Sequence, residues 1–175
     1  MNVIRVEEHK AEGSGGAAEE PKPAADAPVA IEIVADKKEY PFRGAIRLTV
    51  TYTNTSKKKV ELLASGIAPG EGFDGETYTV ASGGRDKTYS THGIDPAKRS
   101  VTLQAGESWK REVELAALLS NTGDAAHDQE ALPDPFGRLD EYTVRLTWKS
   151  AVNVEAKPAF RGPVESNAVK FSVRR

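Results

Sequence analysis

Residues 45–54, with the sequence AIRLTVTYTN, decide the fold of this chain. Every second residue is apolar, and arginine or threonine stands between these positions; the apolar residues are Ile46, Leu48, Val50 and Tyr52. Successive side chains of a β-strand point to opposite faces of the sheet, whereas a helix would spread these four around its circumference. The stretch therefore predicts a strand with one face in a core and the other in water.

The same alternation recurs on both sides of this stretch, in residues 29–35, 60–64, 107–115, 142–148 and 167–174. One or two weaker strands in the middle bring the total to about seven to eight, which is typical of a sandwich. Helices long enough to connect parallel strands are missing from the pattern, so the strands are expected to be antiparallel. We predict an all-β fold, an antiparallel immunoglobulin-like β-sandwich.

Turn-forming and charged residues follow the first clear strand. Asn54, Thr55 and Ser56 precede Lys57, Lys58 and Lys59, and the strand at 60–64 comes next. We expect a hairpin between the strands at 45–54 and 60–64. Asn-Thr-Ser also fits the glycosylation pattern, but we interpret it as a turn.

Arg111 interrupts the apolar face of the strand at 107–115. We expect its aliphatic stem to cover apolar surface while the guanidinium reaches water. Residues 116–120 predict a single helical turn before a crossover loop.

The composition is that of a globular protein and excludes several kinds of chemistry. Of the 175 residues, 38% are apolar, 29% are charged and none is cysteine, so the chain has no thiol nucleophile, disulfide or thiolate metal site. The net charge of −2 provides no broad positive field, and we expect no nucleic-acid partner. No stretch approaches the roughly 18 apolar residues of a membrane-spanning helix, so we expect no membrane insertion.

The N-terminal part differs in composition from the rest. From His9 to Pro28 it is dominated by Ala, Glu, Gly and Pro. We therefore divide the chain into a disordered arm at 1–28 and a sandwich domain at 29–175. The arm lacks the apolar run of a secretory signal, which predicts a cytoplasmic protein if the chain is complete and an exported one if a signal has been removed.

Several runs resemble bacterial immunoglobulin-like modules. They are KKEYPFRGAIRLTVTYTNTSKKKVEL at 37–62, VTLQAGESWKREVEL at 101–115, YTVRLTW at 142–148 and ESNAVKFSV at 165–173. Among named families, this pattern is similar to the BsuPI-type intracellular proteinase inhibitors. The resemblance implies a sandwich fold and suggests proteinase inhibition, and it assigns no inhibitory residue here.

Tyr142 opens the strand at 142–148, the penultimate one. In Greek-key sandwiches a tyrosine at this place commonly donates its hydroxyl hydrogen to backbone a few residues upstream. We expect Tyr142 to pin the crossover in this way.

The residues that could carry chemistry form no recognisable constellation. The histidines His9, His92 and His127 lie far apart in the sequence, so no histidine metal site is expected. Ser90 and Asp95 flank His92 too closely, within one loop, to take the geometry of a catalytic triad. We predict no catalytic residue, no metal and no cofactor, and hence a protein that is not an enzyme.

Acidic residues gather in the segment before the penultimate strand: Asp124, Asp128, Glu130, Asp134, Asp140 and Glu141. Calcium requires several oxygens that converge on one point, but this spacing fits no EF-hand loop. We interpret the segment as solvated charge, with calcium binding as the alternative. The lysines at 57–59 likewise suit solubility and edge protection, or contact with an acidic partner.

A long insertion at 65–99 separates two strands. Its inner part at 76–90 can form a hairpin around the turn Ser82-Gly83-Gly84-Arg85, and its aromatic residues suit an interface. The candidate partner-binding residues are Phe73, Tyr78, Arg85, Tyr89 and His92. The alternative is that this hairpin completes a sheet of the sandwich.

These observations favour a non-enzymatic protein-binding or accessory module that presents its loops at 65–99 and 121–140 to a protein partner. A proteinase inhibitor, suggested by the family resemblance, is the second hypothesis. A structural or assembly subunit that docks through its N-terminal arm is the third. The sequence specifies neither the partner nor the oligomeric state.

Overall fold

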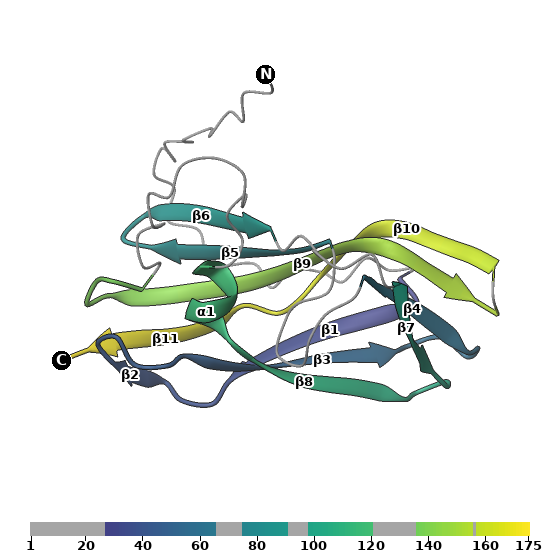
Figure 1. Cartoon of the computed structure of the whole chain (residues 1–175), viewed down its shortest axis with the longest axis horizontal. Coiled ribbons are helices and arrows are strands. Elements are labelled where there is room, and N and C mark those ends of the chain that lie inside the picture. The colour runs from purple at the N-terminus through teal and green to yellow at the C-terminus, as the bar shows by residue number, and fades with distance from the viewer. Residues whose placement is uncertain (1–26, 66–74, 91–97, 121–135, 156) are drawn as a thin grey trace, which may run out of the picture.

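The computed structural model of the chain describes residues 27–65, 75–90, 98–120, 136–155 and 157–175. The described residues form eleven strands and one short helix, arranged as two sheets that face each other (Figure 1). The smaller sheet contains β1 (Val29–Ala35), β3 (Arg47–Asn54) and β8 (Ser108–Glu114). The helix α1 (Leu115–Ser120) follows β8 directly.

The larger sheet contains the other eight strands. Its main path is β2 (Glu39–Pro41), β11 (Val169–Arg174), β9 (Glu141–Val154), β4 (Val60–Ser65) and β7 (Lys98–Leu103). Three more strands extend from this path: β5 (Glu76–Ser82), β6 (Arg85–Ser90) and β10 (Lys157–Glu165). The prediction of an all-β sandwich is confirmed, although the strands outnumber the expected seven to eight. All strand pairs are antiparallel except β2 with β11.

The core lies between the sheets and consists of the alternating residues that the sequence pattern marks. The four apolar residues of the stretch at 45–54 are at most 1% exposed, as is Ile33 of β1. Trp148 of β9, one of the largest fully buried side chains, meets Tyr52 of β3 edge-on with 5.6 Å between ring centroids. Burial of this kind stabilises the fold by about 25 cal/mol per Å² of apolar surface removed from water.

The long strand β9 organises the larger sheet. One of its edges pairs first with β11 and then with β10, and the other pairs first with β5 and then with β4. Its first half therefore supports one end of the sandwich and its second half supports the other. The sequence pattern predicts only the first half of this strand, residues 142–148.

The predicted hairpin between the strands at 45–54 and 60–64 is wrong. β3 pairs with β1 and β8 in the smaller sheet, whereas β4 pairs with β7 and β9 in the larger one. The turn between them carries the chain across the sandwich. Its pivot is the buried amide of Asn54, which accepts from Ser56 and donates to the carbonyl oxygens of Lys58, Leu103 and Gln104 at 2.7–3.1 Å.

The hairpin at 76–90 does form, around the predicted turn. β5 pairs with β9 over six residue pairs, from Glu76 opposite Trp148 to Ala81 opposite Thr143. The alternative that this hairpin completes a sheet is therefore confirmed. Gly75, at φ 83°, begins the segment, and its carbonyl oxygen accepts the amide hydrogen of Lys149 at 2.9 Å.

The outer edge of β1 is joined to the larger sheet by the turn between β10 and β11. The side-chain amide of Asn167 accepts the Ile33 N–H at 2.8 Å and donates to the Ile33 carbonyl oxygen at 2.9 Å. Asn167 thus takes the place of a neighbouring strand, which links the two sheets where β1 would otherwise offer an open edge.

The predicted division into an arm at 1–28 and a domain at 29–175 stays a prediction, because residues 1–26 lie outside the described part. The helical turn predicted at 116–120 is confirmed by α1.

Candidate functional site

A buried polar cluster lies between the sheets. Glu76 of β5 is 0% exposed; its carboxylate accepts from the hydroxyl of Tyr52 on β3 and from the guanidinium of Arg111 on β8. Its second oxygen accepts from the hydroxyl of Tyr78 at 3.1 Å. The Arg111 side chain is 8% exposed, so the expectation that its guanidinium reaches water is wrong.

The charges of Glu76 and Arg111 in this cluster neutralise each other. Burial and the charge of Glu76 raise the pKa of Tyr52 and of Tyr78 well above the ordinary value, which keeps both hydroxyls protonated as donors. Burial alone would lower the pKa of Arg111, but the adjacent carboxylate raises it above its usual range. We assign the cluster a structural role, since its charges pair with each other and lie in the core.

A second group of residues gathers at one end of the sandwich, where β2, β11, β9 and the β5–β6 turn meet. Phe42, directly after β2, donates its amide hydrogen to the Arg174 carbonyl oxygen at 2.7 Å, and Val173 donates to the Asp140 carbonyl oxygen at 2.9 Å. Asp140 in turn accepts the Ser82 hydroxyl hydrogen at 2.6 Å. The ladder therefore fixes these four segments side by side.

A strained turn stands at this end. The amide of Gly44 donates to the Pro41 carbonyl oxygen at 2.7 Å, which closes a four-residue turn with Phe42 and Arg43 at its centre. Arg43 has a φ of 62°, the left-handed region that the third residue of a type II turn requires and that glycine normally supplies. Its guanidinium carbon lies 5.3 Å from the centre of the Phe42 ring.

Exposed apolar side chains are concentrated at the same end. Among the described residues, the large hydrophobic side chains that are clearly exposed are Val34, at 49%, Phe42, at 40%, and Leu139, at 44%. Phe42 and Leu139 flank the end of β11 in the ladder, whereas Val34 lies on the outer face of β1. The segments of Phe42 and Leu139 therefore lie on either side of β11, although 97 positions separate the two residues in the sequence.

Rigid aromatic packing lies beneath this end. Phe136 meets Tyr142 and Phe171 with ring centroids 5.1 Å and 5.8 Å away, and Phe171 meets Tyr40 at 5.3 Å. The Tyr142 hydroxyl donates to the Arg138 carbonyl oxygen at 3.0 Å, which confirms the bond predicted from the sequence and holds the segment before β9 in place.

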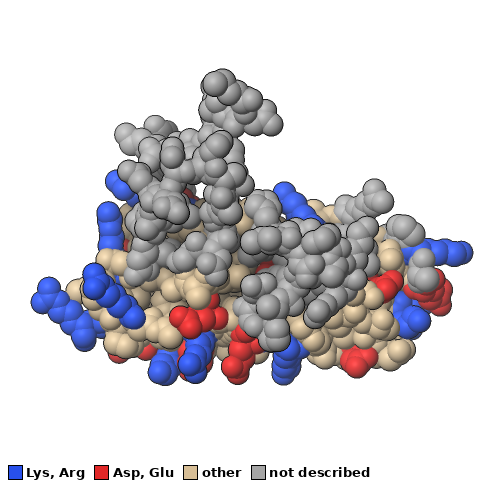
Figure 2. Space-filling view, in the orientation of Figure 1, with Lys and Arg blue, Asp and Glu red and all other residues tan. Residues whose placement is uncertain are grey.

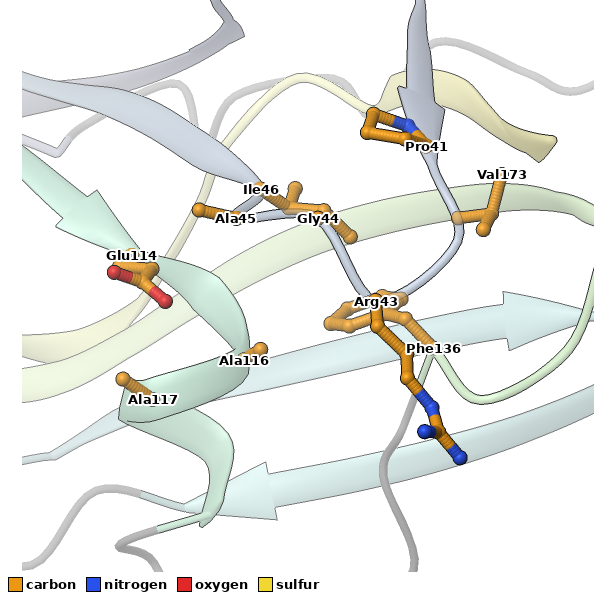
Figure 3. Close-up of a pocket in the computed structure, with 10 residues that line it drawn as sticks. All are labelled: Pro41, Arg43, Gly44, Ala45, Ile46, Glu114, Ala116, Ala117, Phe136 and Val173. Atoms are coloured by element: carbon orange, nitrogen blue, oxygen red, sulfur yellow. The ribbon is translucent and has the colours of Figure 1, made fainter. Parts of the chain in front are cut away.

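An open cavity of about 340 Å³ lies between the turn and α1 (Figure 3). Its walls come from the β2–β3 turn, the end of β8, the first turn of α1 and Phe136. Figure 3 shows Arg43 and Glu114 on opposite sides of it, with the small side chains of Ala116 and Ala117 nearby. The volume is at the lower end of the range for ligand-binding clefts.

Exposed arginines surround this end, and we call it the arginine end. They are Arg43, Arg85, Arg138, Arg174 and Arg175. Figure 2 shows Lys and Arg side chains prevailing at the end of the molecule where Figure 1 marks the C-terminus. The hydrogen bonds from Ser82 and the Glu141 amide lower the pKa of Asp140, with Arg138 and Arg174 contributing, so this carboxyl is ionised.

Of the five residues that the sequence nominated for partner binding, the structure brings Tyr78 and Tyr89 together, as cross-strand partners on β5 and β6. Tyr78 is 0% exposed and bonded to Glu76, so its nomination as a surface contact is wrong: it faces the core because β5 joins the sandwich. Arg85 is exposed at the start of β6, at the arginine end, while Tyr89 is half-buried near the other end of that strand. Phe73 and His92 lie outside the described residues.

Sequence reasoning missed Phe42, Arg43 and Leu139. Phe42 and Arg43 stand in the quoted run KKEYPFRG, and Leu139 belongs to the loop at 121–140 that was expected to face a partner. The sequence feature that could have indicated this site was an apolar residue, Phe42, directly before an arginine, Arg43, in a turn. Most of the acidic segment considered for calcium lies outside the description, and within the described residues no three acidic or histidine side chains converge as a metal site would need.

No helix in the described part of the chain combines the length and apolarity required to cross a membrane.

Comparisons with known proteins place the chain in no family. No family model matches it, and no curated protein matches its sequence. Among solved structures, it is similar to the Pseudomonas fluorescens alkylpurine DNA glycosylase AlkC bound to DNA containing an abasic site analog, at 14% identity and a TM-score of 0.42. It is also similar to Spo0M, a sporulation control protein from Bacillus subtilis, at 10% identity and a TM-score of 0.39.

Each match covers 85% of this chain but only 31% of the glycosylase chain and 50% of the Spo0M chain. The first of these proteins is an enzyme by its name, so the prediction that the chain is not an enzyme is withdrawn, but the match does not show that this chain has an activity. At these scores the likeness concerns the fold alone and assigns no activity or ligand. Proteinase inhibition and the role as a structural subunit stay predictions, as does the absence of a nucleic-acid partner.

Proposed function

We propose that the protein is a binding module that engages a protein partner through the arginine end of its sandwich. The observation that carries this proposal is the exposure of Phe42 and Leu139, two large apolar side chains in the segments that flank the end of β11 on either side. Aromatic side chains bury a large area at small entropic cost, which suits an exposed phenylalanine to an interface.

The backbone at this site supports the proposal. A left-handed conformation at a non-glycine residue costs about 1–2 kcal/mol, and strained conformations persist where the surrounding structure over-determines them, often at functional sites. Here Arg43 takes that conformation and the turn projects Phe42 outward. The aromatic packing of Phe136, Tyr142 and Phe171 provides a base that need not reorganise when a partner binds.

The experiment compares capture of native partners by three forms of the chain. The full chain is immobilised and exposed to extract of its source organism with a reversible cross-linker, beside Phe42→Ser/Leu139→Ser and the control Val34→Ser. Val34 is the matched control, because its 49% exposure is similar but it lies on β1, away from this end. Melting curves first confirm that all three forms are folded.

Proteins captured by the parent and by Val34→Ser, but lost from the double variant, are the expected result. Capture by the double variant equal to that of the parent would reject the arginine end as the binding surface. The absence of any specifically captured protein would reject the binding function itself.

A further inference from the structure

We propose that the outer edge of β8 pairs with the same strand of a second copy of this chain, which joins the two smaller sheets into one antiparallel sheet. This inference goes beyond the proposed function and does not rest on it. It follows from the hydrogen bonds that β8 makes within the chain and from the charges that alternate along the strand.

β8 is the last strand of the smaller sheet and has one open edge (Figure 1). It pairs with β3 along its whole length, from Ser108 opposite Thr53 to Glu114 opposite Arg47. No strand in the described part of the chain pairs with its other side. The open edge therefore offers backbone donors and acceptors to a strand of another molecule.

The hydrogen bonds at the two ends of the β3–β8 pair show which residues present these groups. Asn54 donates to the Glu107 carbonyl oxygen at 2.9 Å, and Leu115 donates to the Ile46 carbonyl oxygen at 2.8 Å. Hydrogen-bonded residues alternate along an antiparallel pair, so the odd-numbered residues from 107 to 115 bond to β3. The even-numbered residues between them direct their N–H and C=O groups outward, and they are Ser108, Lys110, Glu112 and Glu114.

The side chains of these four residues are exposed, and their charges are complementary when the strand meets a copy of itself. No described residue forms an ion pair with Lys110 or Glu112. When two copies of β8 pair antiparallel about a twofold axis at residue 111, Lys110 of each copy lies opposite Glu112 of the other. Both residues direct their backbone groups outward, so they also exchange backbone hydrogen bonds. Opposite charges directly across two strands stabilise the pairing.

The neighbouring registers of the two copies fit less well. An axis at residue 110 places Lys110 opposite itself, and an axis at residue 112 places Glu112 opposite itself. Like charges directly opposite one another destabilise a pair of strands. The charge pattern therefore selects the register centred on residue 111.

The open edges of β6, β7 and β10 lack this pattern. β10 contains Pro158 and Pro163, which have no backbone N–H to donate. The alternation of bonds through β5 and β9 directs residues 86, 88 and 90 of β6 outward, and none of these is a cation. The same reasoning through β4 directs residues 98, 100 and 102 of β7 outward, and none of these is acidic. Of these four edges, only that of β8 carries both signs of charge at its outward positions.

The experiment measures the average mass of the full chain by sedimentation equilibrium over a range of concentrations at low salt, where charge contacts are least screened. The single variants Lys110→Glu and Glu112→Lys each place like charges opposite one another in the pairing. The double variant Lys110→Glu/Glu112→Lys restores opposite charges with the signs exchanged. Glu39→Lys is the control, because it makes the same change of charge at an exposed position on β2 in the other sheet. Melting curves first confirm that every variant is folded.

We expect the masses of the parent and of the control to rise toward twice the monomer mass with concentration. Each single variant should weaken dimerisation by about tenfold, and the double variant should return to within about threefold of the parent. An equimolar mixture of the two single variants should associate more tightly than either variant alone, because each then meets the opposite charge. Hydrogen exchange at the Lys110 and Glu112 amides should slow as the parent concentration rises, since both amides become hydrogen-bonded.

Three results would overturn the inference. The first is a parent that stays monomeric at every concentration, including one whose Lys110 and Glu112 amides become protected only when a different protein is added. The second is dimerisation that the single variants leave unchanged, because the dimer would then form through another surface. The third is a double variant that dimerises as weakly as the single variants, because association would then not depend on opposite charges across β8.

Discussion

Arg111 of β8 and Glu76 of β5 form an ion pair inside the sandwich, with side-chain exposures of 8% and 0%. The pair joins the smaller sheet to the larger one, and the hydrogen bond from Tyr52 to Glu76 joins the same two sheets beside it. Tyr52 and Tyr78 complete the hydrogen bonding of the carboxylate, which is the condition under which a buried charge is tolerated.

Replacing one member of this ion pair should lower the free energy of unfolding more than replacing both members. Glu76→Leu leaves the guanidinium buried without its carboxylate and should lower the free energy of unfolding by about 3–5 kcal/mol. Adding Arg111→Met to that variant should restore part of the loss, because no charge then stays buried. Urea denaturation of the parent, both single variants and the double variant gives the coupling energy.

One result of these denaturation experiments would contradict the predicted coupling between Glu76 and Arg111. If Arg111→Met destabilises the chain equally with Glu76 present and with Glu76 replaced, the two side chains do not stabilise each other.

The tyrosines of the core should make the fold sensitive to alkaline pH. An unfolded tyrosine loses its proton near pH 10, whereas burial and the Glu76 charge raise the pKa of Tyr52 and Tyr78 well above that value. Burial and the Asp36 hydrogen bond similarly raise the pKa of Tyr40 to about 12. Above pH 10 the folded chain therefore binds more protons than the unfolded chain, and its stability falls as pH rises.

The Tyr52→Phe variant measures this effect. Each tyrosine that stays protonated in the fold contributes a slope of about 1.4 kcal/mol per pH unit above pH 10, so the variant should lose stability less steeply. Urea titrations at a series of alkaline pH values provide the slopes. Identical slopes for parent and variant would show that Tyr52 ionises as readily in the folded chain as in the unfolded one.

The sequence predicts the strands whose apolar residues alternate. It does not predict strands that form through pairing at a sheet edge, or turns whose direction depends on long-range hydrogen bonds. The strand predicted at 29–35 coincides with β1, because one face is buried and the other is in water. β10 contains Pro158, Gly162 and Pro163, residues that weaken a strand pattern, and it forms at an edge of the sheet through pairing with β9. The turn after Asn54 has the composition of a hairpin, but its long-range bonds to Leu103 and Gln104 direct the chain into the other sheet.

The candidate site was less predictable than the fold for a physical reason. Phe42 and Leu139 come to lie on either side of β11 only in the folded chain, and β2, which places Phe42 there, is a strand of three residues that no periodicity can reveal. The Glu76–Arg111 pair joins residues 35 positions apart in different sheets. The only signal in the sequence was that Glu76 and Arg111 each stand on the inward face of a strand. That pattern does not show that the two residues pair with each other.

The Tyr142 hydroxyl supplies one hydrogen bond, to the Arg138 carbonyl oxygen, that fixes the segment before β9. Tyr142→Phe keeps the ring contacts with Phe136 and Phe171 and removes this bond, so we expect a loss of about 1 kcal/mol in the free energy of unfolding. Urea denaturation measures it. A midpoint equal to that of the parent would mean that the bond adds nothing to stability.

The Asn54 side chain should matter far more than its exposed neighbours in the same turn. Asn54→Ala removes the donors to Lys58, Leu103 and Gln104 and leaves buried carbonyl oxygens without this partner, which should cost about 2–4 kcal/mol. The control Lys57→Ala, at an exposed position, should change stability by less than about 0.5 kcal/mol. Equal thermal melting of the two variants would reject Asn54 as the pivot between the sheets.

The strain at Arg43 can be separated from the contacts of its side chain by a pair of substitutions. Arg43→Ala and Arg43→Gly both remove the guanidinium and its contact with Phe42, but only glycine accepts a φ of 62° without steric cost. The glycine variant should therefore be more stable than the alanine variant by about 1 kcal/mol, measured by urea denaturation. If the strained turn serves to hold Phe42 in place for binding, the glycine variant should capture less of the native partner than the alanine variant does, although it is the more stable of the two. The reason is that glycine gives the turn more conformational freedom. An alanine variant at least as stable as the glycine variant would show that residue 43 leaves the left-handed conformation in solution, and the rigid presentation of Phe42 would then lose its basis.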